Sequence, residues 1–206
     1  MCRLGRGVGG EVWAVGDRAT GRTYALKLLA EEASEREMAA LVREAVALSG
    51  LEGLGVPRVI RFGRLPNSGR AYLVREVVEG DSLETLLSRR GNARAALESL
   101  ARAADQLTVL HRTGLLHGDV KPANIIVEPG GSVVFVDLGL AAPWREGGAL
   151  AEGLTPRYAA PELFEGKPIT VRAEVFALGV MLAEIVEADG LGLEPAVRTQ
   201  LNAVAE

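Results

Sequence analysis

The stretch that decides the fold is His117-Gly-Asp119-Val-Lys121-Pro-Ala-Asn124-Ile-Ile126, in which a carboxylate, an ammonium and an amide lie within six residues. A second motif, Val136-Asp137-Leu-Gly139, places another carboxylate eighteen residues after Asp119. The β-branched residues at 125–127 and 133–136 predict a short β-hairpin. The two polar motifs therefore flank a predicted hairpin.

The residues upstream of position 78 have the pattern of a small sheet with one helix. Alternating apolar residues predict four strands, at 11–15, 23–29, 59–65 and 71–77. Ser34 and Glu37 form an S-x-x-E capping box that predicts the start of a helix, and Gly50 is placed to end it.

From residue 82 onward the pattern becomes mostly helical. Residues 97–110 form a long amphipathic segment, and residues 173–186 form an apolar one. The sequence therefore predicts an α+β protein with a small β-rich lobe at 1–78, a connection near 77–80 and a larger helical lobe at 79–206.

Composition narrows the class of protein. The chain has 206 residues, is 48% hydrophobic and 24% charged, and carries a net charge of -4. These values are typical of a soluble globular protein and give no attraction to nucleic acid or anionic lipid. A single cysteine, Cys2, excludes an internal disulfide and suits a reducing compartment. No transmembrane segment or signal peptide is predicted, so the cytoplasm is the expected location.

The N-terminal glycines match the pattern G-x-G-x-x-G in Gly5-Arg-Gly7-Val-Gly-Gly10. Dinucleotide-binding folds use the same letters, but there the glycines open a helix. Here a predicted strand follows, which favours a glycine-rich β-hairpin that covers the phosphates of ATP. A plain glycine-rich turn is the alternative for this motif taken alone.

Lys27 lies on the predicted strand 23–29, where a lysine is usually a solvated residue. Glu44 lies between Leu41 and Leu48 at helical spacing, so we expect it to project from the buried face of its helix. Because a buried carboxylate needs a cationic partner, we expect Glu44 to pair with Lys27. Glu37 is explained by the capping box.

In order and spacing, these motifs together resemble a eukaryotic-type, bacterial-like Ser/Thr protein kinase domain, from Gly5 to about Glu187. Ala160-Pro-Glu162 matches the family motif that closes the activation segment. The resemblance implies a two-lobed fold, with an antiparallel sheet and one helix in the first lobe and helices in the second. It also implies ATP- and Mg²⁺-dependent transfer of a phosphoryl group to Ser or Thr of a protein substrate.

The resemblance assigns a role to each motif. Asp119 would orient the substrate hydroxyl and accept its proton, Lys121 would steady the γ-phosphoryl charge, and Asn124 and Asp137 would hold Mg²⁺. Lys27, held by Glu44, would contact the α- and β-phosphates. The other residues implied in nucleotide binding are Gly5, Gly7 and Gly10 at the phosphates, Val12, Ala25 and Ile126 at the adenine ring, and the backbone of Glu76 and Val78.

Several positions depart from the family. Arg75 stands where the family has an apolar residue behind the adenine, and Gly118 stands where it has an arginine that grips an activation-loop phosphate. No Ser, Thr or Tyr lies between Asp137 and Leu154. We therefore expect constitutive activity or control by a partner. Glu174 replaces an aspartate that anchors the catalytic loop.

The chain has twenty residues after Val186, fewer than the family's last three helices need. It is therefore expected to be a fragment, or to have its exposed apolar surface covered by a partner protein or a second copy. Arg172 or Arg198 would replace the usual partner of Glu162.

Two other functions compete. The glycine in His117-Gly-Asp119 resembles small-molecule phosphotransferases of the aminoglycoside or choline kinase type, whereas Lys121-Pro122 and Ala160-Pro-Glu162 favour a protein kinase. A pseudokinase scaffold is the second alternative, although Lys27, Asp119 and Asp137 are all retained.

Overall fold

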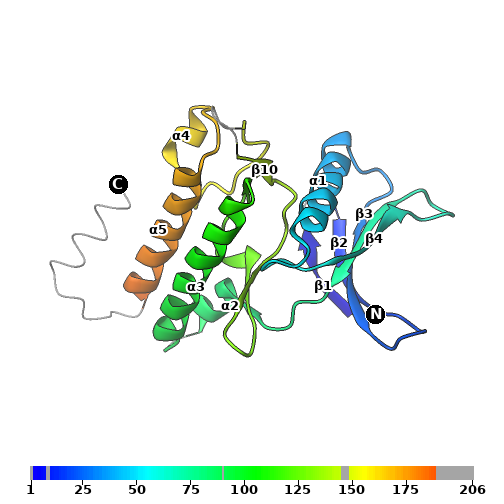
Figure 1. Cartoon of the computed structure of the whole chain (residues 1–206), viewed down its shortest axis with the longest axis horizontal. Coiled ribbons are helices and arrows are strands. Elements are labelled where there is room, and N and C mark those ends of the chain that lie inside the picture. Colours follow the sequence, from blue (N-terminus) through cyan, green and yellow to red (C-terminus); the bar gives the residue numbers. More distant parts are fainter. Residues whose placement is uncertain (1, 8–9, 90, 145–148, 189–206) are drawn as a thin grey trace. The chain divides into compact units, whose positions relative to one another are not determined.

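The computed structural model describes residues 2–7, 10–89, 91–144 and 149–188. The chain forms two compact units (Figure 1). Unit 1 comprises Met1–Val78 together with Asp137–Gly139, and unit 2 comprises Glu79–Val136 and Leu140–Glu206. The first break lies inside the predicted connection at 77–80, but the short segment that carries Asp137 belongs to unit 1 although its neighbours in sequence belong to unit 2.

Unit 1 is built on a five-stranded antiparallel sheet with the order β1-β2-β3-β5-β4. Its strands are β1 (Cys2–Gly7), β2 (Gly10–Gly16), β3 (Thr23–Leu29), β4 (Val59–Arg64) and β5 (Ala71–Glu76). The four predicted strands are present. We did not predict β1, because its sequence is rich in glycine and arginine and has no β-branched residue.

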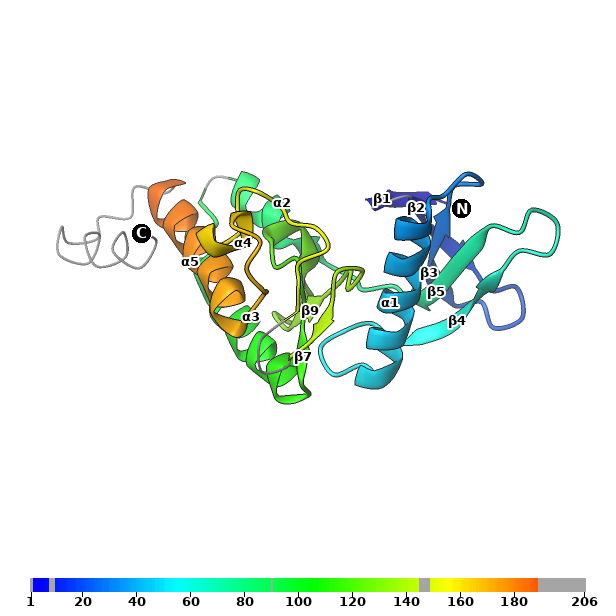
Figure 2. The ribbon, with the colours of Figure 1, turned by 90° about the horizontal axis from the view of Figure 1, so that it is seen from above.

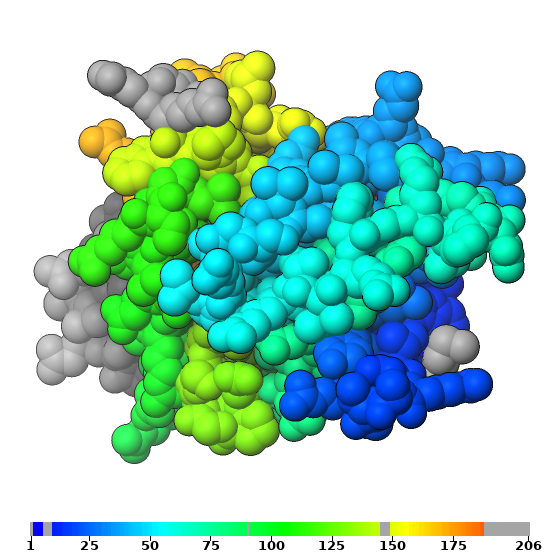
Figure 3. Space-filling model, turned by 45° about the vertical axis from the view of Figure 1, so that its right-hand side comes forward, coloured from blue at the N-terminus to red at the C-terminus, as the bar shows by residue number. Residues whose placement is uncertain are grey.

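The helix α1 (Glu35–Leu51) covers one face of this sheet (Figure 2) and lies beside the β4–β5 hairpin (Figure 3). Its capping box is confirmed, since the Ser34 hydroxyl accepts from the Glu37 N–H and the Glu37 carboxylate accepts from the Ser34 N–H. The prediction that Gly50 ends the helix is wrong. The helix continues to Leu51, and Glu52, with φ of 48°, takes the left-handed position that stops it.

Unit 2 is mostly helical, as predicted. Its elements are β6 (Asp81–Ser82), α2 (Leu83–Ser88), α3 (Ala93–Arg112), β7 (Leu115–Leu116), the 3₁₀ helix η1 (Pro122–Asn124), β8 (Ile125–Val127), β9 (Val133–Phe135), β10 (Ala142–Pro143), α4 (Pro161–Phe164) and α5 (Val171–Ala188). The helices α3 and α5 lie side by side (Figure 1). Leu107 and Leu110 of α3, Met181 of α5 and Phe135 of β9 are fully buried between these elements.

The predicted hairpin is β8–β9, and η1 joins it directly to the segment that contains Asp119 and Lys121. Among the described residues no helix combines the length and the apolar character needed to cross a membrane. Arg198 lies outside the described residues. Cover of the second lobe by a partner or a second copy stays a prediction.

The corrected end of α1 gives a stability test. Gly50 is helical, and a Cβ there would meet no atom within 4 Å, whereas Gly53 has φ of 83° and a Cβ there would come within 2.9 Å of the Arg58 side chain. We expect Gly50→Ala to raise the free energy of unfolding by about 0.5–1 kcal/mol, because alanine loses less backbone entropy in a helix.

The matched variant Gly53→Ala should instead lower the free energy of unfolding, because its left-handed backbone disfavours alanine. Denaturant unfolding followed by Trp13 fluorescence in a Trp144→Phe background would report on unit 1. If Gly50→Ala destabilises the protein, position 50 requires glycine and the helix ends there after all.

Candidate active site

In unit 1, the ammonium of Lys27 joins two carboxylates. Lys27 Nζ lies 2.6 Å from Glu44 Oε2 and 2.8 Å from Asp137 Oδ1. The side chain is only 6% exposed because β3 alternates, so that Ala25, Lys27 and Leu29 all point into the unit. The expected pairing of Lys27 with Glu44 is therefore present, and Asp137 joins it from a segment 110 residues away.

The surroundings keep Lys27 charged. Burial lowers the pKa of Lys27, and this is the largest single influence, but the charges and hydrogen bonds of Glu44 and Asp137 together raise the pKa above its ordinary value. The Lys27 ammonium therefore stays protonated at neutral pH.

Asp137 adopts a left-handed backbone conformation, with φ of 62°. This conformation costs a non-glycine residue about 1–2 kcal/mol. It is held by the ion pair with Lys27 and by the Arg43 guanidinium, which donates to the Gly139 carbonyl at 2.7 Å. Strained backbone that the surrounding structure maintains is frequent at functional sites.

The predicted nucleotide residues of unit 1 lie on its sheet. Gly5 and Gly7 are in β1, with Gly7 paired to Gly10 in β2, and a Cβ on Gly10 would come within 2.5 Å of the Leu28 carbonyl oxygen. The loop between the two strands, at 8–9, lies outside the described residues. The glycines therefore open a β-hairpin rather than a helix.

The residues expected at the adenine are divided between the two units. Val12 lies opposite Lys27 in the sheet, and Ala25 is buried in β3. Glu76 ends β5, and its N–H already donates to the Arg58 carbonyl at 2.9 Å. In the described part of the chain, the Val78 backbone makes no hydrogen bond to another backbone group. Ile126 belongs to unit 2, in the middle of β8.

In unit 2, Asp119 is at the centre of a compact hydrogen-bond network. Lys121 Nζ lies 2.5 Å from Asp119 Oδ2, and the Thr155 hydroxyl donates to Asp119 Oδ1 at 2.7 Å and accepts from Lys121 at 3.1 Å. The Asn124 amide donates to the Asp119 carbonyl at 2.9 Å. We did not predict a role for Thr155, because it lies 36 residues from Asp119 and only the folded chain brings them together.

A buried carboxylate anchors this network. Glu174 of α5 accepts the Gly118 N–H through Oε1 at 2.7 Å, and its Oε2 lies 2.6 Å from Nε2 of His111 at the end of α3. Glu174 is 3% exposed, so both of its oxygens need these partners. The glutamate therefore reaches the catalytic loop in the place where the family has an aspartate.

His117 is fully buried beneath the loop. Its Nδ1 accepts the Asp119 N–H at 3.3 Å, so its Nε2 carries the proton and donates to the Val136 carbonyl at 3.2 Å. Its ring centroid lies 5.2 Å from that of Phe135. His117 thus ties the backbone of Asp119 to the residue that precedes Asp137.

The backbone of Gly118 explains why this position has no arginine. Gly118 has φ of 87°, and a Cβ there would lie 1.9 Å from the Leu140 carbonyl oxygen. No side chain fits that space, so the loop in this form requires glycine.

Asn124 of unit 2 and Asp137 of unit 1 each carry an oxygen of the kind that Mg²⁺ prefers. The bond from Asn124 to Asp119 uses only the amide nitrogen, and Asp137 supplies a carboxylate. Across the described residues no group of three or more His, Cys, Asp or Glu is arranged to hold a metal. Mg²⁺ keeps several waters and readily takes phosphate oxygens, so one amide and one carboxylate suit it.

Comparison with known families gives a match to the protein kinase domain over residues 1–194. This chain belongs to the protein kinase family. The match confirms the two-lobed α+β class, and the similarity to bacterial serine/threonine-protein kinases confirms the bacterial Ser/Thr type.

Named relatives of this kinase domain are bacterial. It is 35% identical to the serine/threonine-protein kinase PknA of Mycobacterium tuberculosis over 189 residues, which cover 86% of this chain and 43% of PknA. It is 36% identical to PkaB of Streptomyces coelicolor over 200 residues, covering 89% of this chain and 46% of PkaB. The kinase domain thus spans less than half the length of these relatives.

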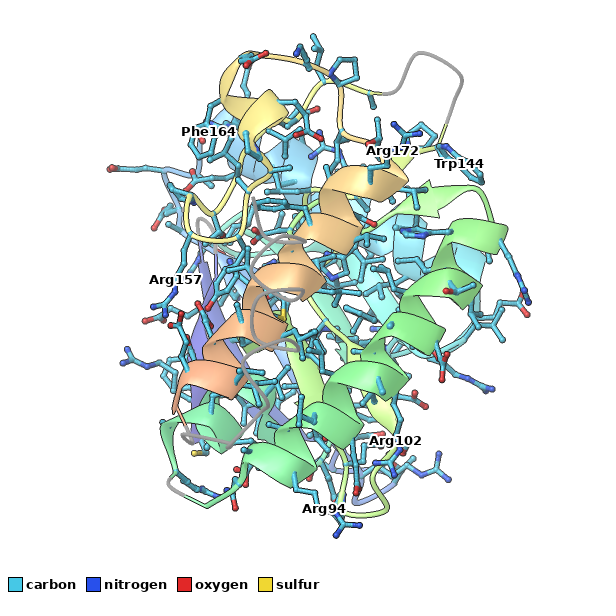
Figure 4. All side chains as sticks on the ribbon, turned by 90° about the vertical axis from the view of Figure 1, so that its left-hand side faces the viewer. Arg94, Arg102, Trp144, Arg157, Phe164 and Arg172 are labelled. Carbon is cyan, nitrogen blue, oxygen red and sulfur yellow. The ribbon has the colours of Figure 1, made fainter. Side chains whose placement is uncertain are left out.

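In this kinase domain, two further contacts join the segment that follows Thr155 to α5. The guanidinium of Arg157 (Figure 4) forms an ion pair with Glu184 of α5, and the Tyr158 hydroxyl donates to the other oxygen of Glu184 at 3.2 Å. Burial, together with the negative charge of Glu184, raises the pKa of Tyr158 to about 12. The phenol therefore stays protonated and keeps this segment fastened to α5.

The structure does not pair Glu162 with Arg172, one of the two arginines expected to replace its usual partner. Among the described residues, neither forms an ion pair with the other, although Arg172 lies at the start of α5 in the same unit (Figure 4). The replacement expected from the sequence therefore stays a prediction.

The geometry of Gly118 predicts a large effect of the smallest side chain. We expect Gly118→Ala to lower the free energy of unfolding by at least about 2 kcal/mol, because alanine adds the cost of a left-handed backbone to a clash with Leu140. Gly130→Ala is the matched control, since a Cβ there would meet no atom within 4 Å.

Denaturant unfolding followed by Trp144 fluorescence in a Trp13→Phe background would compare the two variants. If Gly118→Ala and Gly130→Ala are equally stable, position 118 does not require glycine and the loop accepts other residues there.

Proposed function

We propose that this chain transfers the γ-phosphoryl group of ATP to a Ser or Thr hydroxyl of a protein substrate, in an Mg²⁺-dependent reaction. The observation that carries the proposal is the network of Asp119, Lys121 and Thr155, which presents a carboxylate beside a fixed ammonium. The names of the relatives, serine/threonine-protein kinases, support the same chemistry.

Unit 1 supplies the proposed nucleotide site. Lys27 would neutralise the α- and β-phosphates, and Glu44 holds it in place at 2.6 Å. The hairpin with Gly5, Gly7 and Gly10 would approach the phosphates with backbone N–H groups. Val12, Ala25 and the backbone of Glu76 and Val78 would contact the adenine from unit 1, and Ile126 from unit 2. The assignment of residues 1–78 to nucleotide binding and 79–206 to catalysis belongs to this proposal.

Asn124 and Asp137 would hold the metal, which, when bound, neutralises charge on the β- and γ-phosphates. Asp119 would accept the proton of the acceptor hydroxyl as its oxygen bonds to the γ-phosphorus. The bond from that phosphorus to the bridging oxygen breaks, and ADP leaves with the electron pair. Lys121 would offset the charge of the γ-phosphoryl oxygens. The hydrogen bonds from Thr155 to Oδ1 and from Lys121 to Oδ2 fix the orientation of the Asp119 carboxylate.

The location proposed for this reaction is the cytoplasm, because a chain whose only cysteine is the exposed Cys2 suits a reducing compartment. A small-molecule phosphotransferase and a pseudokinase scaffold are the outcomes against which the proposal is tested.

The first test is transfer of labelled γ-phosphate. We expect the chain, given ATP, Mg²⁺ and a generic protein acceptor, to label Ser or Thr, and Asp119→Asn to lower the rate at least about a hundredfold, because it removes the proton acceptor. Asp105→Asn, an exposed aspartate on α3, is the matched control.

The same assay with aminoglycosides and choline separates the alternatives. Label only on a small molecule would make the chain a small-molecule phosphotransferase. Binding of ATP without transfer to any acceptor would make it a pseudokinase.

A second prediction concerns activation. Because no Ser, Thr or Tyr lies between Asp137 and Leu154, and Gly118 replaces the arginine that would bind a phosphate there, we expect activity without prior phosphorylation. Enzyme made without exposure to ATP should phosphorylate substrate with no lag, and phosphatase treatment should leave its rate unchanged. A lag that autophosphorylation removes would refute this.

A further inference from the structure

Arg75 lies in the interior of unit 1 beside the Lys27–Glu44 pair. It is in β5, opposite Ala25 of β3 and Val59 of β4. Its side chain is 11% exposed, and its Nε lies 3.8 Å from Glu44 Oε1. Both of these atoms are buried and have no hydrogen-bond partner among the described residues. A charged side chain thus occupies a position where the family has an apolar one.

Glu44 therefore faces two cations. Its Oε2 is bonded to Lys27 at 2.6 Å, and its Oε1 faces Arg75. With Asp137, which bonds to Lys27 at 2.8 Å, the cluster contains two cations and two carboxylates and is neutral. Without Arg75 the same cluster would carry one net negative charge, and it would attract a phosphate near Lys27 less strongly.

We propose that Arg75 is a positioning residue that shares Glu44 with Lys27 and thereby selects ligands with phosphate groups. Its positive charge offsets part of the Glu44 charge, so that the Lys27 ammonium, which Glu44 Oε2 still holds at 2.6 Å, attracts an anion more strongly. This inference rests on the proposed function, because it assumes that Lys27 meets the phosphates of a nucleotide.

The proposal attributes the effect to the charge of Arg75 and not to the shape of its side chain. Variants that change one of these properties and keep the other therefore test it. Arg75→Met keeps a long flexible side chain and removes the charge, whereas Arg75→Lys keeps the charge. Arg61→Met is the matched control, because Arg61 is exposed on β4 and its loss changes the net charge of the chain by the same amount.

The measurement is the dissociation constant of each variant for ADP and for adenosine, by calorimetry without Mg²⁺. We expect Arg75→Met to weaken ADP binding about fivefold to tenfold and to change adenosine binding less than about twofold, because only ADP carries charge for Arg75 to act on. Arg75→Lys should restore ADP binding to within about threefold of the unmodified chain, and Arg61→Met should leave both constants unchanged.

Three results would overturn the inference. Arg75→Met could weaken binding of ADP and of adenosine equally, which would mean that side-chain shape causes the effect. Arg75→Met could leave ADP binding unchanged, or Arg75→Lys could fail to restore it. If Arg75→Met does not fold, Arg75→Gln replaces it in the same comparison. Because binding is measured without turnover, the proposed function fails separately, through absence of ADP binding or of phosphoryl transfer in the unmodified chain.

Discussion

Unit 1 depends on the buried ion pairs that the Lys27 ammonium forms with Glu44 and Asp137. A lysine that is 6% exposed keeps its charge only with carboxylates in contact, and here Glu44 comes from α1 and Asp137 from a segment far along the chain. The pair thus fixes how α1 lies on the sheet and why residues 137–139 belong to unit 1. Removing one partner of such a buried pair typically costs about 3–5 kcal/mol, because the other charge is left unpaired. The same ion pair that holds the unit together also positions the group proposed to contact phosphate.

Unit 2 depends on a different kind of constraint, the complete use of buried polar atoms. Glu174 uses one oxygen for the Gly118 N–H and the other for His111, and His117 uses both ring nitrogens on backbone groups. These bonds fix the backbone on both sides of Asp119, so its carboxylate needs only Lys121 and Thr155 to hold its direction. A carboxylate held in this way is preorganised, and it would need little motion to meet the proposed acceptor hydroxyl.

The two replacements that made the sequence unusual have opposite structural explanations. Gly118 is a local matter, because its left-handed backbone and the nearby Leu140 carbonyl leave no room for a side chain. Arg75 depends on segments far apart in the sequence, because its guanidinium faces the Glu44 carboxylate, which also binds Lys27. The absence of an arginine at position 118 therefore reflects the backbone, whereas the arginine at position 75 places a second cation beside Glu44.

The sequence by itself determined the features that depend on neighbours along the chain. The capping box at Ser34, four strands of the sheet, the β8–β9 hairpin and the two long helices of unit 2 follow from short-range patterns, and the helical spacing of Glu44 was enough to indicate its pairing with Lys27. Only the tertiary structure decided what depends on distant neighbours: the third partner of Lys27, the hydrogen bond of Thr155 to Asp119, the direction of Arg75, and a helix end at Glu52 in place of Gly50. The physical reason is that local patterns specify backbone conformation and which face of an element is buried, whereas the partner of a buried polar atom is set by segments that meet only when the chain has folded.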